Sequence, residues 1–77
     1  MQEIPIKSEI TASVWKILVQ PGDSVIAGQD LMILESMKME IPLQSPAAGT
    51  IRSLSVAEGQ SITEGELVAM VAMVTSL

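Results

Sequence analysis

Short apolar runs alternate with turn-forming residues along the whole chain, and this pattern predicts a protein built from β-strands. Val, Ile, Leu and Thr come in runs of about five to eight residues, the usual length of a strand. No window carries a convincing apolar stripe at helical spacing. The predicted strands, about eight in number, span residues 3–7, 14–19, 24–25, 31–35, 39–44, 50–56, 61–62 and 67–74.

The chain also repeats itself. The segment VWKILVQPGDSVIAGQDLMIL, which begins at Val14, aligns without a gap with IRSLSVAEGQSITEGELVAMV, which begins at Ile51, at an offset of 37 residues. Glycines and apolar residues fall in register, as in the pairs Gly22/Gly59, Gly28/Gly65, Val25/Ile62 and Leu31/Val68. Glycine at a turn can take a positive φ. Each half therefore reads as strand, turn, very short strand, turn, strand.

Two halves with one apolar face each can bury those faces against each other. We therefore expect a single domain over residues 1–77, an all-β flattened barrel or sandwich of two pseudo-symmetric, four-stranded halves. Pro42 and Pro46 predict an edge strand or a bulge after the central turn, because proline cannot donate a ladder hydrogen bond. The predicted core is Ile17, Val19, Val25, Leu31, Ile33, Ile41, Leu43, Leu54, Val56, Ile62, Val68, Met70 and Ala72.

The amino-acid composition argues against several classes of function. The chain has neither cysteine nor histidine, so we expect no disulfide, no metal site and no catalytic triad. Nine acidic residues against four scattered basic ones give a net charge of −5, and Trp15 is the one aromatic residue. Nucleic-acid binding is therefore disfavoured.

A membrane location is also disfavoured by the sequence. The longest apolar run, 67–74, is too short to span a bilayer as a helix and suits a buried strand instead. The first ten residues have no apolar core behind a basic start, so no signal peptide is predicted. We expect a cytoplasmic protein that is a monomer by itself.

The segment LESMKMEI stands at the centre of the repeat, where two predicted strands must turn back on each other. This arrangement places Lys38 at the tip of a hairpin, with Met37 and Met39 beside it. A lysine at such a tip is usually only a solvated surface residue, and methionine is usually core. Flexible methionines beside an exposed lysine instead suit a surface that another protein recognises.

The hexapeptide ESMKME resembles the biotin-attachment signature, in which the lysine between two methionines is biotinylated. The resemblance to biotinyl/lipoyl carrier domains continues through QSPAAGTI and EGQSITEGELVAMV and so covers most of the chain. It implies that Lys38 carries covalent biotin. It also implies that a biotin protein ligase and later partners recognise the residues around this lysine, namely Glu35, Ser36, Met37, Met39 and Glu40.

The same resemblance implies a biotin carboxyl carrier, a non-catalytic subunit or domain of a biotin-dependent carboxylase complex. Such a carrier moves carboxyl groups between a biotin carboxylase and a carboxyltransferase. Ser36 departs mildly from the family pattern, in which alanine is common at that position.

Two alternatives stay open at this point. The chain could be a lipoyl carrier for 2-oxoacid dehydrogenase or glycine-cleavage chemistry, although related lipoyl domains usually show Asp-Lys-Ala at the tip. It could also be an unmodified structural or adaptor domain of the same shape. Biotin on Lys38 is favoured because Met-Lys-Met stands at the centre of the repeat.

Overall fold

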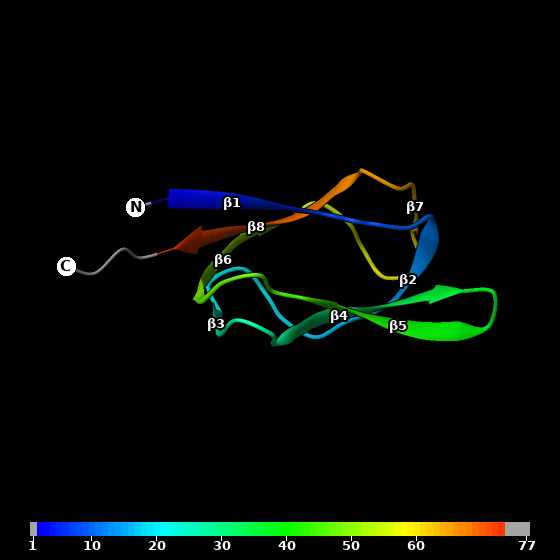
Figure 1. Ribbon diagram of the computed structural model, residues 1–77, viewed down its shortest axis with the longest axis horizontal. Helices are drawn as coiled ribbons and strands as arrows, with labels where there is room; N and C mark the ends of the chain where they lie inside the picture. The colour runs from blue at the N-terminus through cyan, green and yellow to red at the C-terminus, as the bar shows by residue number, and fades with distance from the viewer. Residues whose placement is uncertain (1, 74–77) are drawn as a thin grey trace.

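The computed structural model describes residues 2–73, and over that range the chain is all β, as predicted (Figure 1). Within these residues there is no helix that could cross a membrane. The strands are β1 (Gln2–Lys7), β2 (Ala12–Ile17), β3 (Ser24–Val25), β4 (Asp30–Ser36), β5 (Met39–Gln44), β6 (Gly49–Leu54), β7 (Ser61–Ile62) and β8 (Leu67–Met73).

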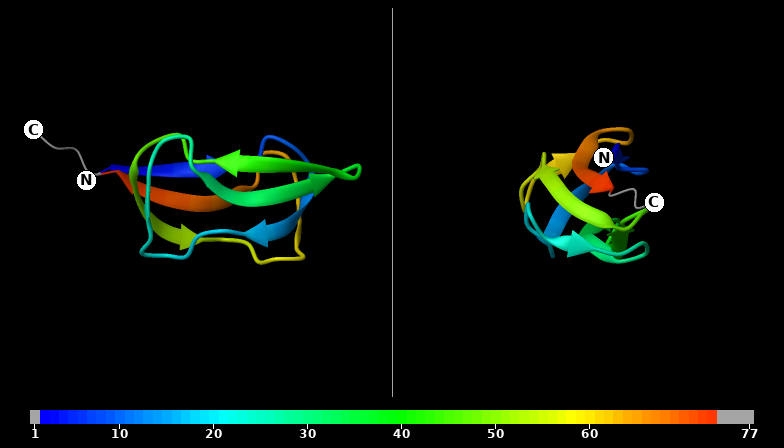
Figure 2. Two further views of the ribbon diagram at one scale, coloured as in Figure 1. Left: turned by 90° about the horizontal axis from the view of Figure 1, so that it is seen from below. Right: turned by 90° about the vertical axis from the view of Figure 1, so that its left-hand side faces the viewer.

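The strands form two four-stranded antiparallel sheets that face each other. One sheet has the order β1-β8-β6-β3, and the other has the order β5-β4-β2-β7. The body is elongated, with extents of 44 × 18 × 17 Å. The β4–β5 hairpin projects at one end of the long axis, and the start of β1 and the end of β8 lie at the opposite end (Figures 1 and 2).

The predicted two-fold repeat is confirmed and extends further than the sequence alignment proposed. Adding 37 to the bounds of β1, β2, β3 and β4 gives the bounds of β5, β6, β7 and β8. The first strand therefore also has a counterpart, since EIPIKS at 3–8 matches EIPLQS at 40–45. Loop hydrogen bonds repeat as well: the Gly22 N–H donates to the Ile51 carbonyl at 2.7 Å, and the Gly59 N–H donates to the Val14 carbonyl at 2.7 Å.

Glycine is required at the turns that follow β2 and β6. Gly22 has φ 97° and Gly59 has φ 88°, a backbone region that residues with a Cβ rarely adopt. The predicted turns at these two positions are therefore confirmed. In each turn the backbone is also fastened by a side chain, because Asp23 accepts from the Gln20 N–H at 2.9 Å and Gln60 accepts from the Ala57 N–H at 3.1 Å.

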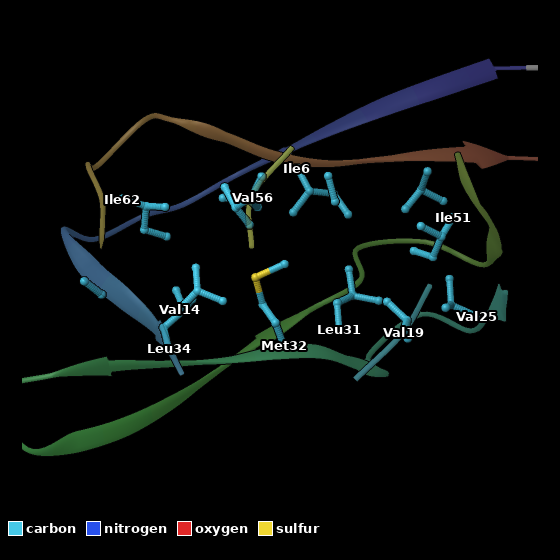
Figure 3. Packing of buried hydrophobic residues seen from close by; sticks show 14 residues of the cluster. Ile6, Val14, Val19, Val25, Leu31, Met32, Leu34, Ile51, Val56 and Ile62 are labelled. Carbon is cyan, nitrogen blue, oxygen red and sulfur yellow. The ribbon is translucent and has the colours of Figure 1, made fainter. Parts of the chain in front are cut away.

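The core lies between the two sheets and receives side chains from both (Figure 3). The prediction is correct for Val19, Val25, Leu31, Val56, Ile62, Val68 and Ala72, which are buried. Ile17, Leu43 and Leu54 are partly buried and pack against the core. It is wrong for Ile33, Ile41 and Met70, which are only half-buried and lie outside the core cluster. The prediction also missed buried residues, namely Ile6, Ala12, Val14, Met32, Leu34, Ile51, Ala69 and Val71.

β-bulges explain these errors. Regular alternation along a strand would put Leu31 and Ile33 on the same face, but an irregularity between Asp30 and Met32 shifts the register against β5. As a result Leu31 and Met32 are both buried, the inward phase continues with Leu34, and Ile33 turns outward. A matching irregularity between β1 and β8 places Val68 and Ala69 side by side in the core.

Strand boundaries differ from the prediction by about two residues. Strands β2 and β6 begin and end earlier than expected, at Ala12–Ile17 and Gly49–Leu54. Pro42 lies in an edge strand as predicted, because β5 ends the order of its sheet. Pro46 follows the end of β5 at Gln44 and is therefore outside the strand that was predicted to contain it. Residue 74, the predicted last residue of the final strand, lies outside the described range.

Two buried serines were not anticipated. Ser8 and Ser45 are equivalent in the repeat, and each is 2 % exposed. The Ser45 hydroxyl donates to the Ala47 carbonyl at 2.7 Å, and the Ser8 hydroxyl donates to the Ile10 carbonyl. Each hydroxyl thus has a hydrogen-bond partner within the loop that follows an edge strand, and this bond offsets the cost of burying the hydroxyl.

Substituting Gly49 with alanine should destabilise the fold by about 1–3 kcal/mol, the usual cost of overpacking. An added Cβ would collide with the backbone carbonyl of Ala72 and approach Val71 Cγ1 to 2.9 Å, and the Ala72 backbone is held in the β6–β8 ladder. Urea unfolding followed by circular dichroism measures the change. Ser53→Ala, an exposed site on the same strand, should stay within about 0.5 kcal/mol. Equal midpoints for the two variants would contradict the prediction.

Candidate functional site

The β4–β5 hairpin ends in a two-residue turn. Ser36 pairs with Met39, so the turn consists of Met37 and Lys38 alone. Their φ values are 52° and 66°. Two successive positive φ values in a two-residue loop define a type I′ turn, whose twist matches that of the flanking strands. The sequence predicted the hairpin, with residues 36–38 between its strands, and the structure shortens this connection to Met37 and Lys38.

The turn holds two side-chain-bearing residues where glycine or asparagine is usual. A left-handed conformation costs an ordinary L-residue roughly 1–2 kcal/mol. Backbone strain of this kind is found preferentially at functional sites, because there it positions a particular side chain. Met37 and Lys38 are thus held in a conformation that their own backbone preferences oppose.

The side chains around the turn are open to solvent. Met37 is 92 % exposed and Met39 is 64 % exposed, so both lie outside the core, as expected for a tip. Lys38 is exposed as well. In the range 2–73 the ion pair that forms is Arg52 with Glu3, and neither the ion pairs nor the side-chain hydrogen bonds of that range involve Lys38. The side chain of Lys38 is therefore accessible to another molecule.

The structure brings all six predicted site residues together at the end of one hairpin. Glu35 and Glu40 are directly opposite each other, one residue pair below Ser36 and Met39. Both glutamates are exposed, and Ser36 is half-buried. Like charges directly opposite on a sheet are unfavourable. Sequence reasoning assigned Trp15 neither to the core nor to the site, and the structure places it half-exposed on the adjacent strand β2.

This arrangement offers a primary amine and little other chemistry. The described residues contain no group of three His, Cys, Asp or Glu side chains that could hold a metal ion. The hydrogen bonds of residues 2–73 include none from Lys38 to a base that could take its proton. A lysine ε-amine in water is almost entirely protonated at pH 7 and is then not nucleophilic. The site is suited to covalent modification by a separate enzyme.

The exposed methionines should contribute little to stability. Met37→Ala and Met39→Ala should each change the free energy of unfolding by less than about 0.5 kcal/mol, as surface substitutions usually do. Met32→Ala is the matched control, because Met32 is fully buried in the same hairpin and its truncation should cost about 2–5 kcal/mol. Thermal melts of the three variants decide the matter. A large loss at Met39 would mean that this side chain packs against the body.

Comparison with known proteins agrees with this geometry. The family model described as "Biotin-requiring enzyme", which covers biotin/lipoyl domains, matches residues 3–71. The "Biotinylated protein TB7.3 homolog" of Mycobacterium leprae is 42% identical over 66 residues, which are 86% of this chain and 93% of that protein. The "Biotin/lipoyl attachment protein" of Bacillus subtilis is 36% identical over 62 residues, which are 80% of this chain and 85% of that protein.

Solved structures give the same result. The Kluyveromyces lactis urea carboxylase matches with a TM-score of 0.87 and 29% identity, over 94% of this chain and 6% of that chain. The lipoyl domain of the Azotobacter vinelandii 2-oxoglutarate dehydrogenase complex matches with a TM-score of 0.78 and 22% identity, over 91% of this chain and 96% of that domain, a likeness of fold alone. With a family model that covers nearly all of its described residues and an exposed lysine on the central turn, the chain belongs to the biotin/lipoyl attachment family.

Proposed function

We propose that this protein is a biotin carboxyl carrier in which biotin is attached through an amide bond to Lys38 Nζ. The observation that carries the proposal is the position of Lys38. It is the second residue of a strained two-residue turn, at the end of the hairpin that projects from the body (Figure 2). A group attached there extends away from the body and can enter another protein's active site without a clash from the two sheets.

Biotin is favoured over lipoate by the residues of the turn. Met37 and Met39 flank the lysine, as in the biotin-attachment signature that the sequence resembles, whereas the resemblance to lipoyl domains lacks their usual Asp-Lys-Ala. A relative named "Biotin carboxyl carrier protein" in Streptococcus mutans is 43% identical over 54 residues. The lipoyl domain of similar fold is less similar in sequence, at 22% identity.

Loading requires a partner enzyme. Acylation of Lys38 needs a neutral amine and an activated carboxyl group, and the chain supplies neither. A biotin protein ligase that presents biotin as its acyl-adenylate supplies both. The neutral Nζ attacks the acyl carbon, and the bond from that carbon to the phosphate oxygen breaks, so that AMP leaves. The nitrogen releases one proton and keeps one hydrogen in the amide. The role of the turn in this step is to place Nζ, with few neighbours around it, inside the ligase.

The loaded carrier acts by bringing its tethered biotin into the active sites of other enzymes. Biotin supplies a ureido ring that takes up and releases a carboxyl group. Lys38 contributes a flexible side chain, and the two-sheet body contributes a rigid base, so that the tethered ring is held at a high effective concentration near each active site. No residue of this chain needs to act as an acid or a base for that purpose.

The partners on either side of the transfer are a biotin carboxylase and a carboxyltransferase. Relatives of this chain include segments of larger proteins, among them the Bacillus subtilis pyruvate carboxylase, 40% identical over 62 residues that make up 5% of its length. The Saccharomyces cerevisiae urea amidolyase contains another such segment, 33% identical over 66 residues and 4% of its length. These relatives support carboxylase partners as a class.

Incubation with a biotin protein ligase, ATP and biotin should add one biotin per chain, and peptide mapping should place it on Lys38. Lys38→Arg should abolish labelling, because arginine keeps the positive charge but lacks a primary amine. Lys7→Arg and Lys16→Arg are matched controls on exposed strand positions and should label normally. Intact mass distinguishes biotin, lipoate and no adduct.

Two results would count against this proposal. Label that persists in Lys38→Arg would assign the site to another lysine. A lipoate adduct formed by a lipoate ligase, together with failure of biotin labelling, would make the protein a lipoyl carrier.

The methionines should matter for loading. Met37→Ala and Met39→Ala should each lower kcat/KM for ligase-catalysed labelling by about tenfold, because well-packed apolar contacts at the centre of an interface contribute most of its binding energy. The measurement is initial rates of labelling over a range of carrier concentrations. Unchanged rates in both variants would show that the ligase does not contact these side chains.

A further inference from the structure

The two halves of the domain provide an internal comparison of what the fold requires. Of the five large apolar side chains that are exposed within residues 2–73, four lie on or next to the sheet that carries the Lys38 hairpin, β5-β4-β2-β7, namely Trp15, Leu18, Met37 and Met39. The fifth, Ile26, follows β3 of the other sheet. Their counterparts 37 residues away in the other half are polar wherever the structure describes them. The pairs are Trp15 with Arg52, Leu18 with Ser55, Ile26 with Thr63, and Met39 with Gln2.

The fold does not explain this difference. Trp15 occupies a bulge of β2, since the register against β4 shifts between Val14 and Lys16. Arg52 occupies the same bulge of β6, where the register against β8 shifts between Ile51 and Ser53. The same backbone therefore accepts a charged residue in one half and an aromatic residue in the other. Bulges often redirect a side chain next to a functional site.

Arg52 has an ionic partner, whereas its counterpart cannot form one. Its guanidinium pairs with Glu3 of the edge strand β1 at 3.8 Å, reaching past the intervening strand β8. The counterpart of Glu3 is Glu40, on the edge strand β5, and the intervening strand there is β4. In the sheet that carries the Lys38 hairpin, the bulge residue is a tryptophan, so Glu40 has no counterpart of the Arg52 guanidinium that pairs with Glu3.

The charge imbalance is increased by the residue between them. Glu35 of β4 pairs with Ser13 on one side and with Glu40 on the other, while its counterpart in the second half is Ala72. At these equivalent positions the sheet β1-β8-β6-β3 has one carboxylate, Glu3, and one guanidinium, Arg52. The sheet β5-β4-β2-β7 has two carboxylates there and the exposed ring of Trp15. Such a set can accept an arginine or lysine from outside, with its charge over the ring face and its donors on the carboxylates.

We propose that Trp15, Glu35 and Glu40 form a docking surface for a cationic side chain of the biotin protein ligase, which supplies in trans the charge that Arg52 supplies in the other sheet. The proposal rests on the proposed function. It extends the ligase contact from the Lys38 turn to strand β2 and makes Trp15 a specificity-determining residue.

The position of Trp15 suits contact with an enzyme that acts on Lys38. Its neighbours Val14 and Lys16 pair with Leu34 and Ile33, which lie three to four residues from the turn. At about 3.3 Å per residue, this places the bulge roughly 10–13 Å from the tip along the strand. A specific interface covers about 800 Å² per partner, more than two methionine side chains can provide, so the contact must extend down the hairpin.

Charge supports the ligase as the occupant. An enzyme that holds an acyl-adenylate must neutralise its phosphate, and the cations that do so make the entrance of its active site positive. The carboxylates of Glu35 and Glu40 lie one residue pair below the turn, on the part of the hairpin that follows Lys38 toward that entrance. The net charge of −5 favours the same encounter.

The test replaces Trp15 with the residue that the second half has at the same bulge. Trp15→Arg should fold normally and should lower kcat/KM for ligase-catalysed biotinylation about tenfold or more, with the change in KM rather than kcat. Trp15→Phe should retain most of the wild-type value, because it keeps an aromatic face. Ile26→Thr is the matched control: it makes the same kind of exchange between halves, in the turn after β3 at the end of the body away from the hairpin (Figure 1).

Glu40→Gln gives an independent measurement. The KM of the wild type should rise with sodium chloride concentration, and this rise should be smaller in Glu40→Gln. Wild-type protein that labels on Lys38 together with a Trp15→Arg variant that labels at the same rate would overturn the docking surface alone. Wild-type protein that no biotin ligase labels would overturn both this surface and the proposed function. Loss of carboxylation in Trp15→Arg with normal biotinylation would assign the surface to a later partner and would also overturn the proposal.

Discussion

The shared core between the two sheets is the constraint on which the rest of the structure depends. Each sheet has one apolar face, and neither face can be satisfied without the other in a chain of this size. Side chains that are fully buried come in equivalent pairs from the two halves, such as Leu31 with Val68 and Leu34 with Val71. Because the core is symmetric, the strands, bulges and glycine turns that build it must also be symmetric.

Symmetry then identifies what the core does not need. The ends of β4 and β5, Ser36 and Met39, are joined by a two-residue turn, whereas their equivalents, Met73 of β8 and Gln2 of β1, pair without a turn between them. A two-residue turn with two positive φ values costs conformational energy, and the β8–β1 pair forms in the same symmetric core without one. The cost is therefore associated with the residues displayed, Met37 and Lys38, and not with packing.

Much of this fold could be predicted from the sequence because the repeat, the glycine turns and the apolar runs are local signals. The hairpin tip was predictable for the same reason. The phase of burial was not predictable, since a bulge such as that at Leu31 depends on pairing with a strand that follows later in the chain. Ile33 and Met32 consequently exchange the faces that regular alternation assigns to them. Trp15 was overlooked for a related reason: a bulge in β2 places an apolar residue on the surface.

A domain of this kind must be recognised closely enough to be modified at one lysine and loosely enough to be released for the next step. An interface that used only the apolar tip would be small, and one that used a large apolar face would make a small acidic domain prone to association. An aromatic side chain beside two carboxylates avoids both problems. The carboxylates keep this surface hydrated, and the surface binds strongly only to a cation whose geometry lets it contact the ring and the carboxylates together. The sheet that carries the Lys38 hairpin has this combination, and the sheet that has Arg52 does not. Selectivity for one face of a nearly symmetric molecule can therefore depend on very few side chains.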